Sequence, residues 1–301
     1  MSNKENKLTT EDFVKCATNI NSANSSIMEN KSGIFLPYKN IEKTIVAKVF
    51  SDNDREMTMY EDDNVLIKIK GRLLGQHHKD VLEVLLSEKL QFNTGTSNFS
   101  LNITAYRILK KLDIDSSNKK YLIKKLSEIS QSRVWIKYKK TNKIIDFGFI
   151  DTISDEAIKE KDIWVHFTKG YTHFMGISEL KDYSVFIPHI VKIKEPLIKS
   201  MVRYMLMQKG NNSQISIEKL INEKLRITSY LTSKQISQKI KILESNQMQK
   251  YLASHFGIRL TNNNKTITFN NSNKILELDN EVKTVISDKK HYVFQPALKF
   301  T

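Results

Sequence analysis

Cysteine and long hydrophobic runs are both scarce in this sequence of 301 residues. Cys16 is the single cysteine, so no disulfide can form within the chain, and no Cys and His residues have the spacing of a zinc site. No stretch approaches the roughly 20 apolar residues that a membrane-spanning helix needs, and the first residues lack the apolar region of a signal peptide. We therefore expect a cytoplasmic protein without a membrane partner, and we exclude a secreted disulfide scaffold.

Motifs for enzymatic chemistry are also missing. The glycine-containing segment 71–75 is followed by Gln76 and His77, where a phosphate-binding P-loop needs Lys and then Ser or Thr. His77 and His78 are adjacent, so they diverge on a regular helix or strand and do not form the metal-binding pair of a strand-nicking enzyme; we expect them at an exposed helix start. The two aspartates of residues 113–115 fall in a predicted turn, where capping explains them. We predict no catalytic residue, no metal site and no cofactor.

Acidic residues are few relative to basic ones. The chain has 48 Lys and Arg against 33 Asp and Glu, a net charge of +15. Residues 107–143 hold twelve basic residues and three acidic ones, a net of +9. Residues 231–265 hold six basic residues and one acidic one, a net of +5. This concentration of positive charge favours a polyanionic partner, and double-stranded DNA is the first candidate.

The hydrophobic pattern predicts three helices and a hairpin in the first half of the chain. Apolar residues recur at helical spacing in three segments, 78–90, 102–112 and 119–130. Residues 133–140 and 144–153, rich in β-branched and aromatic side chains, flank a turn at 141–143 and are typical of a β-hairpin. Strands are also predicted at 65–71, where apolar and polar residues alternate, and at 98–101. The resulting order of helix, strand, helix, helix and hairpin is that of a winged helix, a variant of the helix-turn-helix.

A similar order recurs in the second half. Helices are predicted at 195–208, 217–225 and 233–245, followed by a hairpin at 257–270 around an Asn-rich turn. We therefore predict an α+β fold with two tandem winged-helix domains. The predicted organisation is a flexible N-terminal arm at 1–40, domain 1 at 41–180, domain 2 at 181–275 and a C-terminal tail at 276–301.

The helical register predicts which side chains face DNA in the first domain. If Leu122, Leu126 and Ile129 point to the core, the opposite face of the third helix is polar and basic. An ordinary solvated face is the alternative reading of the helix alone, and the adjoining basic hairpin favours DNA. The predicted DNA-binding residues are Ser117, Lys120, Tyr121, Lys124 and Gln131 on the helix, and Arg133, Lys137 and Lys139 in the hairpin.

The same register argument applies to the second domain. With Ile236, Ile240 and Leu243 turned inward, the outer face mixes amides with Lys, which suits base edges because Gln can bond to adenine and Lys to guanine. Ile242 either contacts a thymine methyl group or packs on a neighbouring helix. The predicted DNA-binding residues are Lys234, Gln235, Gln238, Lys241 and Ser245 on the helix, and Arg259 and Lys265 in the hairpin, where they would hold phosphates.

Two segments carry a family resemblance. Residues 71–82, GRLLGQHHKDVL, and residues 193–206, IKEPLIKSMVRYML, resemble the segments that open the two domains of iteron-binding plasmid replication initiators, including the TrfA-type proteins. The resemblance spans about residues 65–270. It implies a protein that binds repeated sites at a plasmid origin, helps to open adjacent AT-rich DNA and recruits the host initiator and replicative helicase. It also implies self-association as a dimer that represses its own gene.

Three other functions remain open from the sequence. A winged-helix transcriptional regulator would use the same domains without opening DNA. A strand-nicking replication enzyme belongs to another class, and the absence of a His motif argues against it. A basic protein that coats nucleic acid without sequence preference would bind specific and random DNA equally. The initiator is the function that the sequence favours.

Overall fold

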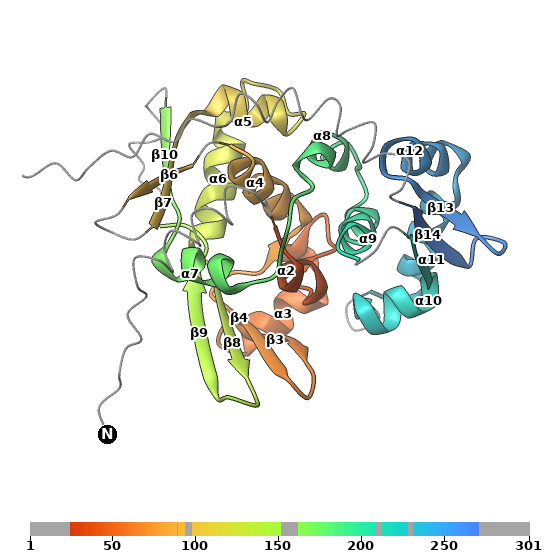
Figure 1. The fold of residues 1–301 in the computed structure, drawn as a ribbon, viewed down its shortest axis with the longest axis horizontal. Coiled ribbons are helices and arrows are strands. Elements are labelled where there is room, and N and C mark those ends of the chain that lie inside the picture. The colour runs from red at the N-terminus through yellow and green to blue at the C-terminus, as the bar shows by residue number, and fades with distance from the viewer. Residues whose placement is uncertain are drawn as a thin grey trace, which may run out of the picture. The chain divides into compact units, whose positions relative to one another are not determined.

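The computed structural model describes residues 25–88, 90–93, 98–151, 162–208, 212–227 and 231–270. They form a mixed structure of helices and small sheets, as predicted for the α+β class (Figure 1). The chain divides into two compact units, Met1–Ser200 and Met201–Thr301. Among the residues described, no helix combines the length and the apolar character that crossing a membrane would require.

Three helices pack against one another in the first unit. They are α4 (Gln76–Leu86), α5 (Ala105–Lys111) and α6 (Lys119–Ser130), and each of them contacts the other two. The predicted bounds of α6 are confirmed, and its Leu122, Leu126 and Ile129 are buried. The helix α5 begins later than predicted because residues up to Thr104 belong to a strand, and the Thr104 hydroxyl caps the helix by accepting from Arg107 N.

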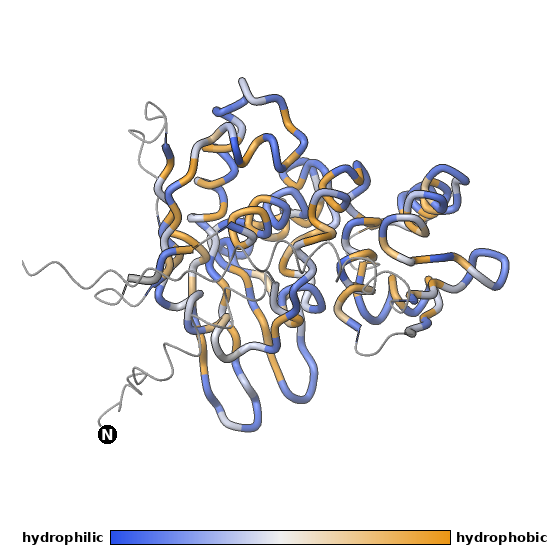
Figure 2. The backbone as a smooth tube through the Cα atoms, turned by 45° about the horizontal axis from the view of Figure 1, so that its top comes forward, coloured by the Kyte–Doolittle hydropathy of each residue, from blue (hydrophilic) through white to orange (hydrophobic). Residues whose placement is uncertain are grey.

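The predicted hairpin is confirmed, but it belongs to a larger sheet. Strands β8 (Arg133–Tyr138) and β9 (Lys143–Gly148) join β3 (Glu56–Glu61) and β4 (Val65–Lys70) in the order β3-β4-β8-β9. All neighbours in this sheet are antiparallel. Along β8, Val134 and Ile136 are buried, while the alternate residues face outward as the two-residue period of a strand requires. Figure 2 shows the two hairpin tips of this sheet as hydrophilic and the strands behind them as more apolar.

A second sheet of the first unit follows the order β10-β7-β6. Its strands are β6 (Gln91–Asn93), β7 (Asn98–Thr104) and β10 (Asp162–His166). Aromatic residues in strands are expected to pack, but Trp164 of β10 is 45% exposed and stacks on His166. The reason is the strand register, since Ile163 and Val165 take the buried side of β10.

An aromatic cluster joins the large sheet to helix α7 (Lys169–Ile177). Phe147 of β9 and Phe149, which follows the strand, lie against Tyr171 and Phe174 of α7. The ring centroids within this cluster are 4.7 to 6.2 Å apart. All four rings are buried. Burial on this scale stabilises by roughly 1.5–3 kcal/mol for each large apolar side chain.

The prediction of a flexible arm over residues 1–40 is wrong for its last part, while residues 1–24 lie outside the described residues. Strand β1 (Ser25–Ser26) pairs with β11 (Leu180–Lys181), and helix α2 (Ile27–Lys31) follows it. Strand β2 (Phe35–Leu36) pairs in parallel with β5 (Leu74–Gly75). The segment is held because Glu29 forms a fully buried ion pair with Lys79, at 3.0 Å, and accepts a hydrogen bond from the Tyr171 hydroxyl. A short 3-10 helix, η1 (Ile41–Lys43), and helix α3 (Ile45–Asp52) lead into the large sheet.

The boundary between the units lies later in the chain than the predicted 180/181. The first unit includes the 3-10 helix η3 (Ser184–Phe186), helix α8 (Ile187–Ile190), which contacts α4, and the start of α9 (Pro196–Leu206). Lys199 of α9 forms an ion pair with Asp80 of α4, and both side chains are buried. This pairing explains why the residues before Met201 belong to the first unit. The predicted tail at 276–301 lies outside the described residues.

The second unit contains a three-stranded sheet in the order β12-β14-β13. The strands are β12 (Asn212–Ser216), β13 (Ile258–Thr261) and β14 (Thr266–Asn270), and β13 and β14 form the predicted hairpin. The predicted helix 217–225 consists of a short α10 (Ile217–Lys219) and a π-helical turn, η4 (Leu220–Lys224). The predicted helix at 233–245 is α11 (Ser233–Glu244).

Helix α12 (Asn246–Phe256) was not predicted, and it stands between α11 and the hairpin. Ser245 caps its start by accepting from Met248 N, and Gly257 ends it in a left-handed conformation with φ of 67°. A Cβ at position 257 would lie 2.5 Å from the Asn270 carbonyl oxygen, so this turn requires glycine. The helix that directly precedes the second hairpin is therefore α12.

Candidate nucleic-acid interface

The outward face of α6 has the composition that the sequence predicts. Lys120 and Lys124 are exposed on α6, and Ser117 and Gln131, which were predicted on the helix, are exposed just outside its two ends. Lys120 and Lys124 are one turn apart and form no ion pair with any residue that the structure describes. Ser117 is held by Asp115, whose carboxylate accepts from both its backbone N–H and its hydroxyl. The face thus presents two uncompensated cations at helical spacing.

Tyr121 differs from the other predicted contacts because it is half-buried. The ammonium of Lys125 lies 5.8 Å from its ring centroid. Burial, together with the carboxylates of Asp80 and Glu128, raises the pKa of the Tyr121 hydroxyl to about 12. The hydroxyl is therefore protonated at neutral pH and can donate a hydrogen bond.

The three predicted DNA contacts of the hairpin differ in whether they form an ion pair within the protein. Arg133 pairs with Asp146 across the hairpin at 3.1 Å, and Lys139 pairs with Glu61 at 2.8 Å. Lys137 forms no ion pair with a residue that the structure describes. Exposed ion pairs contribute little stability, so Arg133 and Lys139 can exchange their carboxylate partners for phosphates at low cost.

The neighbouring strands add basic groups that the sequence reasoning missed. Lys68 and Lys70 of β4 both contact Glu56 at 2.7 Å, and Lys68 also lies 5.6 Å from the Trp135 ring centroid. These residues face outward beside β8 because β4 pairs with β8 in register from Val65↔Tyr138 to Lys70↔Arg133. The alternating pattern of residues 65–70 signalled a strand, but only the pairing shows that its lysines lie next to the hairpin.

In the second unit, Lys234, Gln238 and Lys241 of α11 are exposed, and Ile242 is 44% exposed and points outward. Two of the predicted base contacts, Gln235 and Ser245, also make hydrogen bonds that cap helices. The Gln235 side chain accepts a hydrogen bond from Thr232 N in a capping box, and Ser245 caps α12 while donating to the Ile242 carbonyl. Both side chains already have partners, so they are weaker candidates for reading bases.

The hairpin of the second unit presents Arg259 on β13 and Lys265 in the turn, and both are exposed. Ile236 and Ile240 were predicted to point inward, but they are only half-buried, and Leu243 is the one buried residue within α11. In α12, by contrast, Leu252 and Phe256 are buried and Gln247, Lys250 and Ser254 are exposed. The apolar spacing of 252 and 256 was available in the sequence and could have identified this helix.

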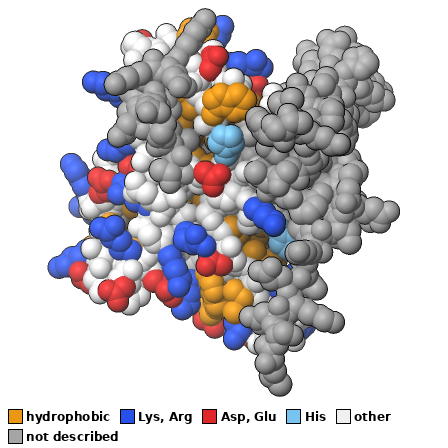
Figure 3. All heavy atoms as spheres, turned by 90° about the vertical axis from the view of Figure 1, so that its left-hand side faces the viewer, with side chains coloured by type: hydrophobic (Ala, Val, Ile, Leu, Met, Phe, Trp, Pro, Cys, Tyr) orange, Lys and Arg blue, Asp and Glu red, His pale blue; other side chains and the backbone are white. Residues whose placement is uncertain are grey.

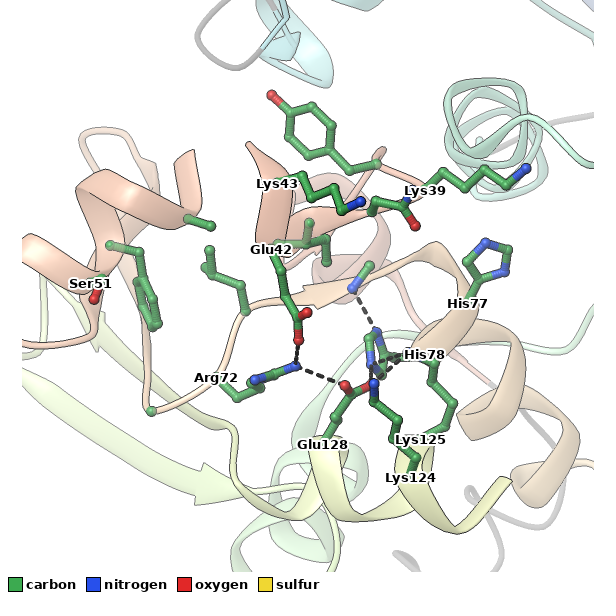
Figure 4. Close-up of a pocket in the computed structure, with 18 of the residues that line it drawn as sticks. Lys39, Glu42, Lys43, Ser51, Arg72, His77, His78, Lys124, Lys125 and Glu128 are labelled. Carbon is green, nitrogen blue, oxygen red and sulfur yellow. Dashed lines mark hydrogen bonds and ion pairs between the residues drawn. The ribbon is translucent and has the colours of Figure 1, made fainter. Parts of the chain in front are cut away.

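Glu128 of α6 organises a polar cluster beside the exposed face (Figure 4). Its carboxylate accepts from Arg72 at 2.8 Å, from His78 Nε2 at 2.8 Å and from Lys125 at 2.6 Å. Arg72 also binds Glu42. Burial alone would raise the pKa of Glu128, but the hydrogen bonds from His78 and Lys125 outweigh it and lower the pKa to about 2. Glu128 is therefore ionised at neutral pH.

His78 is buried, which contradicts the expectation of an exposed helix start. Its Nδ1 accepts from Gly75 N at 2.9 Å, so Nε2 carries the ring proton and donates to Glu128. Burial lowers the pKa of His78, against the opposing effect of Glu128. His78 is thus a neutral structural residue that links the start of α4 to α6, while His77 stays partly exposed.

Figure 3 shows one face of the first unit, on which Lys and Arg side chains alternate with Asp and Glu and only scattered hydrophobic side chains reach the surface. The positive charge predicted from the sequence is therefore not a uniform coating. The uncompensated cations named above are the feature that distinguishes the α6 face.

Comparison with known proteins assigns neither a family nor a function to this chain. No protein-family model matches the chain, and no curated protein matches it. A solved structure described as RctB domains 2-3, RctB-155-483, has 11% sequence identity and a TM-score of 0.42, covering 71% of this chain and 88% of that one. A likeness at this level assigns no function.

Proposed function

We propose that the protein is a sequence-specific double-stranded DNA-binding replication initiator with two tandem winged-helix domains. In this proposal it binds repeated sites at the origin of a plasmid or similar element, promotes opening of adjacent DNA and recruits the host initiator and helicase. The observation that carries the DNA-binding part is the exposed face of α6 beside a basic hairpin, where Lys120 and Lys124 have no carboxylate partner among the described residues. The origin, dimerisation and host partners come from the family resemblance of residues 71–82 and 193–206.

Each unit supports a winged-helix assignment in part. In the second unit, the sheet order β12-β14-β13 places β12, the strand between α9 and α10, beside the last strand of the hairpin, which is the arrangement a winged helix needs. In the first unit, three mutually packed helices precede the hairpin, and the hairpin pairs with β4. The wing of the first unit is therefore braced by two further strands.

The position of α12 affects which helix would read bases in the second unit. A recognition helix usually precedes the wing directly, and here α12 occupies that place with Gln247, Lys250 and Ser254 exposed. The predicted contacts Gln238 and Lys241 belong to α11. We keep α11 as the predicted reader and treat α12 as the competing helix, which substitutions can distinguish.

A footprint of the purified chain on the DNA that flanks its own gene tests the proposal. The experiment uses near-physiological salt and end-labelled strands, so that a nick would also be visible. We expect regularly spaced protection over direct repeats, with uncut strands and distorted AT-rich DNA beside them. A single palindromic footprint at a promoter would favour a regulator, a metal-dependent nick would favour an enzyme, and uniform protection would leave a non-specific coating protein.

Substitutions assign the contacts. Lys124→Ala should weaken binding to all DNA and reduce the slope of log affinity against log salt by about 1, because one phosphate contact is lost. Lys169→Ala removes an exposed charge from α7 and is the matched control. Gln238→Ala should relax the sequence preference, whereas Lys265→Ala should weaken binding to DNA of any sequence. If Gln247→Ala relaxes the preference and Gln238→Ala does not, α12 is the reading helix.

A further inference from the structure

A cleft of about 360 Å³ lies in the first unit, between the segment that precedes the large sheet and helices α4 and α6. This is the size of a small-ligand site. Its apolar walls include Tyr38, Ile41, Phe50 and Leu73. Its charged lining consists of six cationic and two anionic side chains, namely Lys39, Lys43, Arg55, Arg72, Lys124, Lys125, Glu42 and Glu128.

The cations of the cleft are not balanced by its two carboxylates. Glu42 and Glu128 are paired with Arg72 and Lys125. The other four cations form no ion pair with any residue that the structure describes. All four are exposed to solvent, and like charges that line one cleft repel one another until an anion binds between them. The cleft is therefore complementary to a ligand with more than one negative charge.

The guanidinium of Arg72 is held in a position from which it can bind such a ligand. One guanidinium nitrogen, Nη2, serves both Glu42 and Glu128, and the two other nitrogens have no hydrogen-bond partner among the described residues. The side chain is only 33% exposed and is held in position by an ionised, buried carboxylate. A guanidinium fixed in this way can bind a phosphate through two parallel hydrogen bonds without losing much side-chain freedom.

We propose that this cleft binds a phosphate group through Arg72, Lys43 and Lys124, three of the lining residues that Figure 4 labels. The phosphate comes either from a free phosphorylated ligand of nucleotide size or from the backbone of bound DNA. The proposal does not depend on the proposed function, because ligand binding is measurable without DNA.

The test uses the full chain and two probes, ADP and inorganic phosphate, titrated by calorimetry at an ionic strength held constant with chloride. Lys43→Gln removes one exposed, unpaired cation from the cleft. Lys48→Gln makes the same change on the exposed part of α3 outside the cleft and is the matched control. We expect Lys43→Gln to weaken ADP binding about tenfold, as the loss of a charged hydrogen bond does, and Lys48→Gln to leave it unchanged.

The DNA arm separates the two sources of phosphate. If Lys43→Gln weakens the binding of ADP and leaves the affinity for DNA unchanged, the phosphate belongs to a free ligand. If the chain does not bind ADP, and Lys43→Gln lowers its affinity for DNA and reduces the salt slope by about 1, the phosphate is one of the DNA backbone. If Lys43→Gln and Lys48→Gln match the unmodified chain with all probes, the proposal is overturned. A footprint without sequence preference, with ADP binding intact, would refute only the proposed function.

Discussion

Replacing Glu128 with Gln tests whether the charged cluster beneath α6 stabilises the first unit. Glu128 is 6% exposed and accepts from Arg72, His78 and Lys125. Its pKa is lowered from 4.5 to about 2, and each pKa unit corresponds to 1.36 kcal/mol, so the ionised carboxylate contributes about 3 kcal/mol at pH 7. Removing one partner of a buried pair typically costs 3–5 kcal/mol, which is consistent with this figure.

The sign of the pH dependence follows from the direction of the shift. Because the folded-state pKa is lowered, the stabilisation is complete above about pH 4.5 and is lost as pH falls through about 2. The difference in unfolding free energy between Glu128→Gln and the unmodified chain should therefore be about 3 kcal/mol at pH 7. At pH 3 it should be less than half of that.

Urea unfolding followed by tryptophan fluorescence measures this quantity, since the two tryptophans, Trp135 and Trp164, both lie in the first unit. Glu61→Gln is the control, because Glu61 forms an ion pair with Lys139 but is 52% exposed, and exposed pairs contribute about 0–1 kcal/mol. A Glu128→Gln effect as small as that of the control, or one that does not decrease between pH 7 and pH 3, would refute the reasoning.

Three further outcomes are expected. Glu29→Ala should destabilise the first unit by about 3–5 kcal/mol, measured by the same urea unfolding, because it removes the carboxylate that lies 3.0 Å from the buried ammonium of Lys79 and leaves Glu83, at 3.9 Å, as its ion-pair partner; a change below about 1 kcal/mol would mean that residues 25–36 are not docked. Gly71→Ala should cost at least about 1 kcal/mol and lower the melting temperature, since φ is 79° and the added Cβ would lie 2.3 Å from the Gln131 carbonyl oxygen. His78, whose pKa is lowered, contributes stability that is complete above about pH 6.5 and decreases at lower pH; NMR titration of its ring should therefore give a pKa below 6.5, and a higher value would contradict the burial argument.

Strong local periodicity was enough to predict several helices and strands correctly. Leu122, Leu126 and Ile129 recur at spacings of four and three, and a helix with those residues buried is the one conformation that removes all three from water together. The turn at 141–143 and the alternating segments on both sides likewise specified the hairpin β8-β9. The exposure of Lys120 and Lys124 followed directly from the helical register, because a helix fixes the angle between successive side chains.

The contacts between these elements could not be predicted in the same way, because partners far apart in the sequence leave no local pattern. The Asn- and Ser-rich composition of residues 25–40 suggested flexibility, but Glu29 finds its partner at Lys79, fifty positions later. Local spacing likewise placed His78 at a solvated helix start, whereas its burial arises from Glu128 on another helix. The unbalanced cations of the cleft come from separate elements that only folding brings together, so the charge count showed an excess but not where it converges.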